Sequence, residues 1–220
     1  GTIIHDHVSL HLQKGHTVVV IGASGLGKSV LLKCIAGIMQ VDRGRIYIED
    51  TDITRLSAKQ CHQMHLNIGY MFQGAALFDN KTVGQNVAFA MHYHTDLSEA
   101  EIQKRVEQKL ELVGLSEKIN TLPQELSEGM RKRAGLARAI AMDPPILLYD
   151  EPTTGLDPIM VDIINDLIIT TSEKLNVTGI VVTHDMESAF KVGDKIALLV
   201  EGKVVHFGTP QETKDSENEY

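Results

Sequence analysis

The chain has 220 residues, a net charge of −8, 43% hydrophobic residues and 23% charged residues. This length fits one domain, and the ordinary globular composition excludes a disordered chain. The acidic balance disfavours nucleic acid as a partner, and the only two cysteines indicate neither a disulfide framework nor a zinc motif. With no apolar run of membrane-spanning length and no visible signal peptide, we expect a cytoplasmic protein.

Hydrophobic periodicity predicts two kinds of strand. Apolar and polar residues alternate over 8–12 and 46–48, which predicts half-buried antiparallel strands. Continuous apolar runs predict strands buried on both faces, as in a parallel sheet covered by helices. These runs lie at 18–21, 146–148, 180–182 and 196–200, and a final strand is predicted at 204–207.

Helical patterns lie between the predicted strands. Residues 29–39 carry apolar side chains on one broad face. Ser98 to Glu101 form a capping-box signature, which begins a helix with Ile102, Val106, Leu110 and Val113 on one face. The pair Asp157-Pro158 predicts a helix start, followed at helical spacing by Ile159, Ile163, Leu167 and Ile168.

The order of these elements predicts an α/β fold with a mainly parallel sheet and an N-terminal antiparallel β portion. Residues 75–143 lack buried-strand runs, so we expect them to form a helical subdomain inserted into the core. The core would then comprise 1–74 and 144–210, and the whole chain 1–220 would be one domain. The polar, acidic tail 211–220 is expected to fray.

A phosphate-binding loop is predicted at Gly22–Ser29, because the sequence GASGLGKS fits G-x-x-x-x-G-K-[ST] between a strand and a helix. Glycines allow main-chain N–H groups to point inward at phosphate, and the helix N-terminus favours the negative charge. Lys28 is expected to bind the β- and γ-phosphates, and the Ser29 hydroxyl to bind Mg²⁺. Gly22, Ser24, Gly25 and Gly27 complete the predicted cradle for ATP.

Two acids, Asp150 and Glu151, end the apolar run 146–149. Ligands of open α/β sheets bind at the carboxyl ends of strands. Asp150 is therefore expected to hold Mg²⁺, through water. Glu151 is expected to orient and polarise the attacking water.

Four further motifs resemble those of ABC ATPases. Leu126-Ser127-Glu128-Gly129-Met130 resembles the family signature, usually LSGGQ, and Gln73 matches the glutamine of the Q-loop. Gly155-Leu156-Asp157 matches the D-loop, and His184 matches the switch histidine. The motifs keep the family order over nearly the whole chain, so the chain is identified as similar to ABC transporter ATP-binding subunits.

The resemblance implies a head-to-tail dimer in which each ATP lies between the P-loop of one subunit and the signature of the other. Ser127 and Gly129 would contact the γ-phosphate from a helix N-terminus. His184 would contact the γ-phosphate too, and Gln73 would complete the Mg²⁺ or water shell. Catalysis would thus depend on Glu151, His184, Lys28 and Gln73.

The resemblance also implies a membrane permease as partner and a peripheral position on the inner face of the cell membrane. Residues after Gln73 are expected to form the groove for a coupling helix of the permease. They are Ala75, Ala76, Leu77, Phe78 and Val83.

The signature departs from the family pattern at Glu128 and Met130. Helix geometry lets Glu128 point away while Ser127 faces the phosphate, so we expect the site to remain active. Leu77-Phe78, Met130 and the run 149–158 look like the MCE-associated, phospholipid-trafficking subgroup, which implies an MCE-domain protein in the assembly. The aromatic residue that stacks on adenine in this family would precede Ile4, and residues 1–12 contain no Phe, Tyr or Trp.

Four alternative functions share part of this pattern. An ABC importer ATPase for amino acids or another small solute differs only in cargo. A non-hydrolysing nucleotide switch is disfavoured by Glu151 and His184, and a P-loop kinase by the signature. An ABC ATPase acting on DNA would need a coiled coil, zinc insertion or basic face, none of which the sequence shows.

Overall fold

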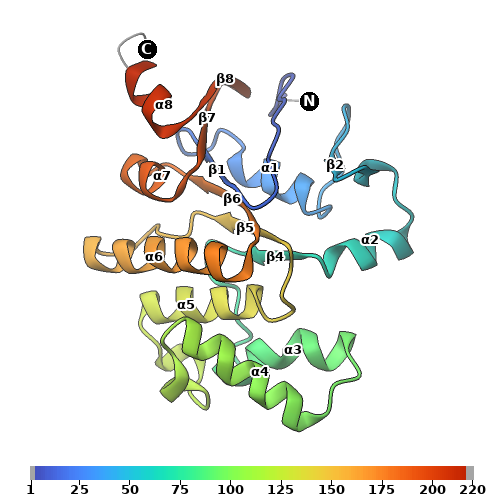
Figure 1. Cartoon of the computed structure of the whole chain (residues 1–220), viewed down its shortest axis with the longest axis vertical. Coiled ribbons are helices and arrows are strands. Elements are labelled where there is room, and N and C mark those ends of the chain that lie inside the picture. The colour runs from blue at the N-terminus through green and yellow to red at the C-terminus, as the bar shows by residue number, and fades with distance from the viewer. Residues whose placement is uncertain (1–2, 217–220) are drawn as a thin grey trace.

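The computed structural model describes residues 3–216 (Figure 1). A six-stranded sheet has the order β4-β5-β6-β1-β7-β8. All of its neighbouring strands are parallel except β7 and β8, which pair antiparallel. The strands are β1 (Thr17–Ile21), β4 (Ile68–Met71), β5 (Ile146–Asp150), β6 (Thr178–Thr183), β7 (Lys195–Val200) and β8 (Lys203–Gly208).

The continuous apolar runs form the strands expected of them, because each strand is buried on both faces. Along β1, Val19 and Ile21 face one core cluster and Val20 faces the other. Leu147 and Leu148 divide between the same two clusters along β5. Successive side chains of a strand point to opposite faces, so burial on both sides requires an unbroken apolar sequence.

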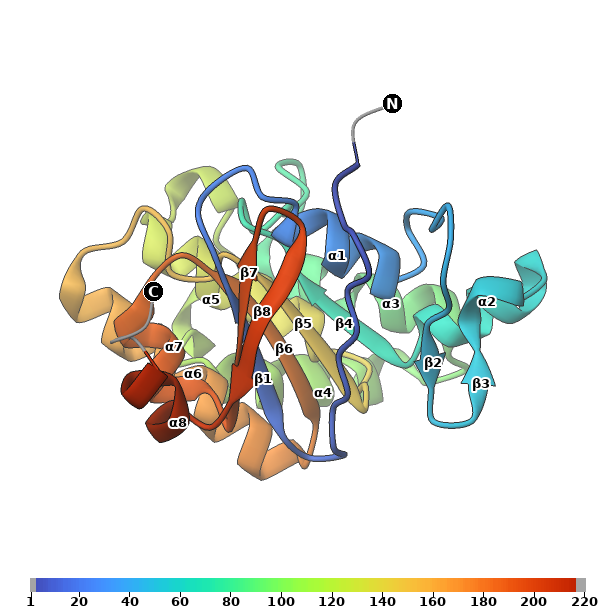
Figure 2. The same ribbon diagram turned by 90° about the horizontal axis from the view of Figure 1, so that it is seen from above.

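Eight α-helices are present among the described residues, and they cover both faces of the sheet (Figures 1 and 2). Helices α3, α4 and α5 lie together at the bottom of Figure 1, whereas α1 lies on the opposite side of the sheet. The helices are α1 (Lys28–Ile35), α2 (Ala58–His65), α3 (Val83–His94), α4 (Glu99–Leu112), α5 (Glu128–Ala139), α6 (Pro158–Leu175), α7 (Met186–Val192) and α8 (Pro210–Ser216).

Short 3-10 helices lie at Ile53–Arg55, Ser116–Lys118 and Pro123–Glu125. The capping box of Ser98 and Glu101 starts α4, and Asp157 caps α6 through two main-chain N–H groups. The stretch 75–143 contains α3, α4 and α5 and no strand.

The predicted strand over 8–12 is wrong, although its burial pattern is as expected. Val8, Leu10 and Leu12 pack against the core cluster around Val20, while Ser9 and His11 are exposed. The segment has this alternation without the ladder hydrogen bonds of a strand. The antiparallel strand predicted at 46–48 is confirmed as β2 (Tyr47–Ile48), which pairs with β3 (Thr51–Asp52).

Two helical predictions differ from the structure in detail. Helix α1 ends at Ile35 rather than 39, because Gly37 at φ +69° reverses the chain and closes the helix end. On α6, Ile159 and Ile163 are 74% and 38% exposed, whereas the predicted Ile168 is buried together with Ile164, Asn165 and Thr171. Because apolar residues lie around most of α6, the sequence does not specify which face is buried, and tertiary packing decides it.

The expected fraying of the tail is wrong for residues 211–216, which belong to helix α8. The rest of the predicted tail, residues 217–220, lies outside the described residues, as do residues 1 and 2. No helix of the described part is long and apolar enough to cross a membrane.

Candidate active site

The loop between β1 and α1 is curled around the Lys28 side chain. Gly25 and Gly27 have φ of +84° and +89°, a conformation that a side chain would strain. Lys28 is only 5% exposed, and its Nζ donates to the carbonyl oxygens of Gly22 at 2.8 Å and Ala23 at 3.2 Å. Gly22 itself has no room for a side chain, because a Cβ would lie 2.5 Å from the Leu199 oxygen.

Asp150, at the end of β5, accepts two hydroxyl hydrogen bonds. Ser29 Oγ donates to Oδ1 at 2.6 Å, and Tyr70 Oη donates to Oδ2 at 3.1 Å. Burial, followed by the charge of Asp150, raises the pKa of Tyr70, so its hydroxyl stays protonated and donates. Asp150 is thereby fixed beside the P-loop helix.

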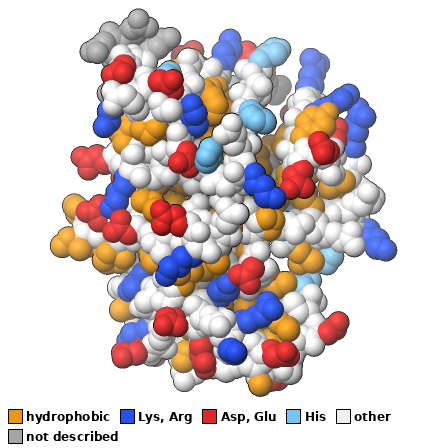
Figure 3. All heavy atoms as spheres, viewed as in Figure 1, with side chains coloured by type: hydrophobic (Ala, Val, Ile, Leu, Met, Phe, Trp, Pro, Cys, Tyr) orange, Lys and Arg blue, Asp and Glu red, His pale blue; other side chains and the backbone are white. Residues whose placement is uncertain are grey.

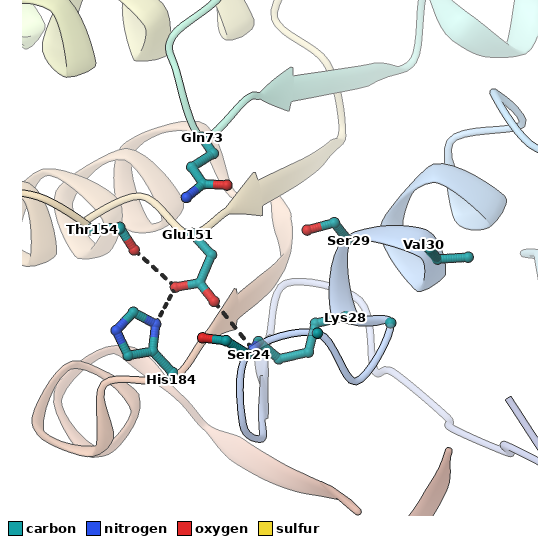
Figure 4. A pocket seen from close by; sticks show the side chains of 10 residues that line it. Ser24, Lys28, Ser29, Val30, Gln73, Glu151, Thr154 and His184 are labelled. Atoms are coloured by element: carbon teal, nitrogen blue, oxygen red, sulfur yellow. Dashed lines mark hydrogen bonds and ion pairs between the residues drawn. The ribbon is translucent and has the colours of Figure 1, made fainter. Parts of the chain in front are cut away.

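Glu151 lies at the centre of a hydrogen-bonded cluster (Figure 4). Its carboxylate is 3.2 Å from Lys28 Nζ, 2.8 Å from His184 Nδ1 and 3.0 Å from Thr154 Oγ1. Burial raises the pKa of Glu151, but the hydrogen bonds of His184, Thr154 and Lys28 together outweigh it and hold the pKa below its usual value. Glu151 is therefore an anion at neutral pH and can accept a proton from water.

A cavity of about 340 Å³ opens over this cluster. It brings together the P-loop, Gln73 from the segment after β4, Glu151 from the segment after β5 and His184 from the segment after β6. These segments meet because they follow neighbouring parallel strands. The lining residues are Ser24, Gly25, Gly27, Lys28, Ser29, Val30, Gln73, Glu151, Thr154 and His184.

The signature residues lie outside this cavity, at the start of α5. Ser127 is exposed, and its hydroxyl accepts a hydrogen bond from Met130 N at 3.3 Å as the helix cap. Gly129 is buried under Met160, whose Cε would lie 2.3 Å from an added Cβ. The Glu128 carboxylate lies over Gly155 of the D-loop, with Oε1 2.8 Å from the position of a Cβ there.

A second cavity, of about 510 Å³, lies beside the segment after Gln73. Ala76 and Phe78 line it, as expected for a groove, together with other aromatic and histidine side chains such as Phe72, Phe89 and His62. Ala75 and Val83 do not line it, because both are buried in the core at 1% and 0% exposure, and Leu77 packs against that core. The predicted groove position is therefore wrong for the buried Ala75 and Val83, and it stays a prediction for the partly exposed Leu77.

Three side chains at the site were missed from sequence. Tyr70 and Thr154 bind the two acids, and Lys132 of α5 donates to the main chain of Gln73 and Glu151. Tyr70 occupies an alternating position of a strand, and Thr154 lies within a quoted motif, so both carried a weak signal. Lys132 lies in the short basic run 131–133, which by itself is typical of a solvated helix face, and only the packing of α5 buries it.

The fold and the site together define a P-loop nucleotide hydrolase of the α/β class. The family profile described as "ABC transporter" matches residues 5–154. The chain belongs to the ABC transporter family, and it is an ATP-hydrolysing subunit of that family.

Relatives with described functions differ in their cargo. The chain is 40% identical over 98% of its length to the intermembrane phospholipid transport system ATP-binding protein MlaF of Haemophilus influenzae, covering 82% of that protein. It is 41% identical over 93% of its length to the probable ribonucleotide transport ATP-binding protein mkl of Mycobacterium leprae. It is 42% identical over 92% to the methionine import ATP-binding protein MetN of Carboxydothermus hydrogenoformans. The chain spans 59% and 60% of the latter two proteins.

Solved structures agree with the fold. A dimeric post-hydrolysis state of the ATP-binding cassette MJ0796 bound to ADP and Pi has a TM-score of 0.87 at 30% identity, covering 94% of this chain and 90% of that one. The cbiO1 subunit of the cbiONQ complex from Clostridium perfringens has a TM-score of 0.89 at 31% identity, covering 97% of this chain and 85% of that one.

Proposed function

We propose that this ATPase powers an ABC transporter of phospholipid type, together with permease subunits in the cell membrane. The observation that supports phospholipid as the cargo is the similarity to MlaF, which extends over 98% of the chain. The departures Met130 and Leu77-Phe78 point the same way. An MCE-domain lipid-binding protein completes the proposed assembly.

The hydrolytic step follows from the geometry of the cavity. Glu151, an anion fixed by Lys28, His184 and Thr154, orients the attacking water and accepts its proton as the γ-phosphate bond breaks. His184 and Lys28 are assigned to stabilising charge on the γ-phosphate. Gln73, which lines the same cavity, is assigned to the water or metal shell.

Magnesium fits the oxygen groups on the P-loop side of the site. Ser29 Oγ and Asp150 Oδ1 lie 2.6 Å apart, and hydroxyl and carboxylate oxygens are the ligands that Mg²⁺ prefers. Ser29, Asp150 and Gln73 would hold it. When bound, Mg²⁺ neutralises charge on the phosphates.

A second copy of the chain is proposed to complete each site. Ser127, at the exposed start of α5, does not line the cavity of its own chain, so a neighbouring P-loop is the proposed target of its N–H groups. The MJ0796 cassette, at 30% identity, is dimeric, which supports a second copy. The groove at Ala76 and Phe78 is proposed to receive the permease, which places the protein on the inner face of the membrane.

An amino-acid importer is the second candidate, because MetN is as similar in sequence as MlaF. The experiment that separates them purifies the chain with its permease in proteoliposomes and follows ATP-dependent transfer of a fluorescent phospholipid. We expect transfer by the wild-type complex and none by the Glu151→Gln complex. ATP-dependent methionine uptake without lipid transfer would reject the lipid proposal.

A further inference from the structure

Lys132 is a buried cation on the helix that begins at the signature. It is 3% exposed and lies four residues after Glu128 on α5. Its Nζ donates to the main-chain oxygens of Gln73 and of Glu151, the latter at 3.2 Å. Because β4 and β5 are paired, one ammonium group joins α5 to both segments that enter the cavity from these strands.

The main chain that Lys132 holds is strained. Glu151 has φ of +47°, in the left-handed region that non-glycine residues avoid. Its N–H donates to the Val182 oxygen at 2.9 Å, and Lys132 binds its carbonyl from the other side. Such a conformation persists only where the surroundings fix it, so Lys132 takes part in fixing the catalytic carboxylate.

The same helix holds a second strained segment. Ala75 and Ala76 have φ of +60° and +49°, and Arg138 donates to both of their carbonyl oxygens. Lys132 and Arg138 are thus two cations of α5 that bind main-chain oxygens at and just after Gln73. A movement of α5 would therefore be passed to this segment as well as to Glu151.

Lys109 is a buried lysine whose contacts are purely structural, and it serves as a comparison. Lys109 on α4 is 8% exposed and pairs with the carboxylate of Asp143, away from the cavity. Lys132 instead directs its Nζ at two carbonyl groups of the site. Burial lowers the pKa of Lys132, while the nearby charges of Glu128, Glu151 and Asp150 act in the opposite direction.

We propose that Lys132 is a positioning residue for ATP hydrolysis, which fixes the main chain of Gln73 and Glu151 relative to the signature helix. When Ser127 binds the nucleotide of the partner subunit, a displacement of α5 is transmitted to the main chain of Glu151 through the hydrogen bonds of the Lys132 ammonium group. The proposal rests on the roles assigned above to Glu151, Gln73 and Ser127.

The test compares Lys132→Met, Lys132→Arg and the matched control Lys109→Met in the full-length protein. Because a small displacement of a catalytic group lowers the rate steeply, we expect Lys132→Met to reduce kcat by about 10- to 100-fold. The Kd for ATP should stay within about threefold, since the P-loop contacts remain. Lys132→Arg should recover at least about a fifth of wild-type kcat, and Lys109→Met should lower Tm with kcat within about twofold of wild type.

Wild-type kcat in a folded Lys132→Met protein would overturn the proposal, as would a loss no larger than that of Lys109→Met at equal Tm. If Lys132→Met does not fold, Lys132→Gln, which keeps one donor, is compared with Lys109→Met by the same criterion. Glu151→Gln is measured in parallel. If Glu151→Gln retains turnover, the role of Glu151 is wrong; if it is inactive while the Lys132 variants are normal, only the role of Lys132 is wrong.

Discussion

The P-loop end and the signature end of the nucleotide site differ in how far a single chain completes them. At the P-loop end, Lys28 and Glu151 are 5% and 7% exposed, and each already has its hydrogen-bond partners. At the signature end, Ser127 and Glu128 are exposed, and the Ser127 hydroxyl serves only as a helix cap. The difference shows that folding organises the P-loop end, whereas the signature residues stay exposed, as the proposed dimer requires.

The distribution of charge on the surface does not favour nonspecific electrostatic binding of a partner. On the face shown in Figure 3, Lys and Arg side chains are interspersed with Asp and Glu. Because this face has no electrostatic potential of a single sign, we expect partners to be selected by the shape of the surface and by the side chains at the two ends of the nucleotide site.

The largest effect is expected at the organised end. Glu151→Gln keeps the size of the side chain but removes the proton acceptor, so kcat should fall by roughly 100-fold or more. Binding of ATP should persist, because Lys28 and the loop N–H groups are unchanged. Phosphate release and nucleotide binding are measured on the same preparation. Turnover close to wild type would mean that the base lies elsewhere.

Mixing inactive variants tests whether the two ends belong to different chains. Lys28→Ala removes the P-loop cation, and Ser127→Arg blocks the signature, so each alone should lose activity by at least about 100-fold. An equal mixture should recover about a quarter of wild-type activity, since half the dimers then contain one intact site of two.

The control for this experiment mixes Lys28→Ala with Glu151→Gln. Glu151 lies 3.2 Å from Lys28 in the same chain, so both changes damage the P-loop half and no intact site can form. Recovery in this control, or none in the first mixture, would contradict the division of the site between two chains.

A smaller effect is expected from Thr154→Val, which removes one hydrogen bond from Glu151. That bond lowers the pKa of Glu151, so its loss raises the pKa. The base acts only when deprotonated, and kcat falls as pH falls through its pKa. The acid limb of kcat should therefore move to higher pH, by up to about one unit.

The matched comparison for the pH profile is Ser127→Ala at the other end of the site. It should lower kcat without moving the acid limb, because Ser127 does not contact Glu151. An unchanged acid limb in Thr154→Val would show that another group controls the pH dependence.

The smallest effect on turnover is expected from Glu128→Gly. The carboxylate lies over Gly155 of its own chain, so its removal should change kcat by less than about tenfold. Loss of an acid from the first helical turn and gain of glycine should lower stability by roughly 1 kcal/mol. ATPase assays and thermal unfolding check both. A rise in kcat of about a hundredfold or more would mean that Glu128 repels the phosphate.

Local sequence patterns predicted the structure correctly where neighbouring residues determine it, as in strands buried on both faces and at helix caps. The apolar runs around Val19 and Leu147 became strands because both faces of the sheet are covered, and Ser98 and Asp157 capped helices as expected. The pattern over 8–12 indicated burial correctly but not pairing, since alternation fixes which side chains are buried and leaves hydrogen-bond partners open.

The sequence by itself determined the chemistry of the P-loop end, because the motif Gly22–Ser29 and the acids Asp150 and Glu151 are local features whose geometry follows from the adjoining strand and helix. Only the tertiary structure decided which groups complete that end. Tyr70 and Lys132 reach it from other parts of the chain, through the pairing of β4 with β5 and the packing of α5, whereas Thr154 reaches Glu151 through the local turn after β5. The burial of Lys132 depends on contacts between segments far apart in sequence, which no local pattern encodes.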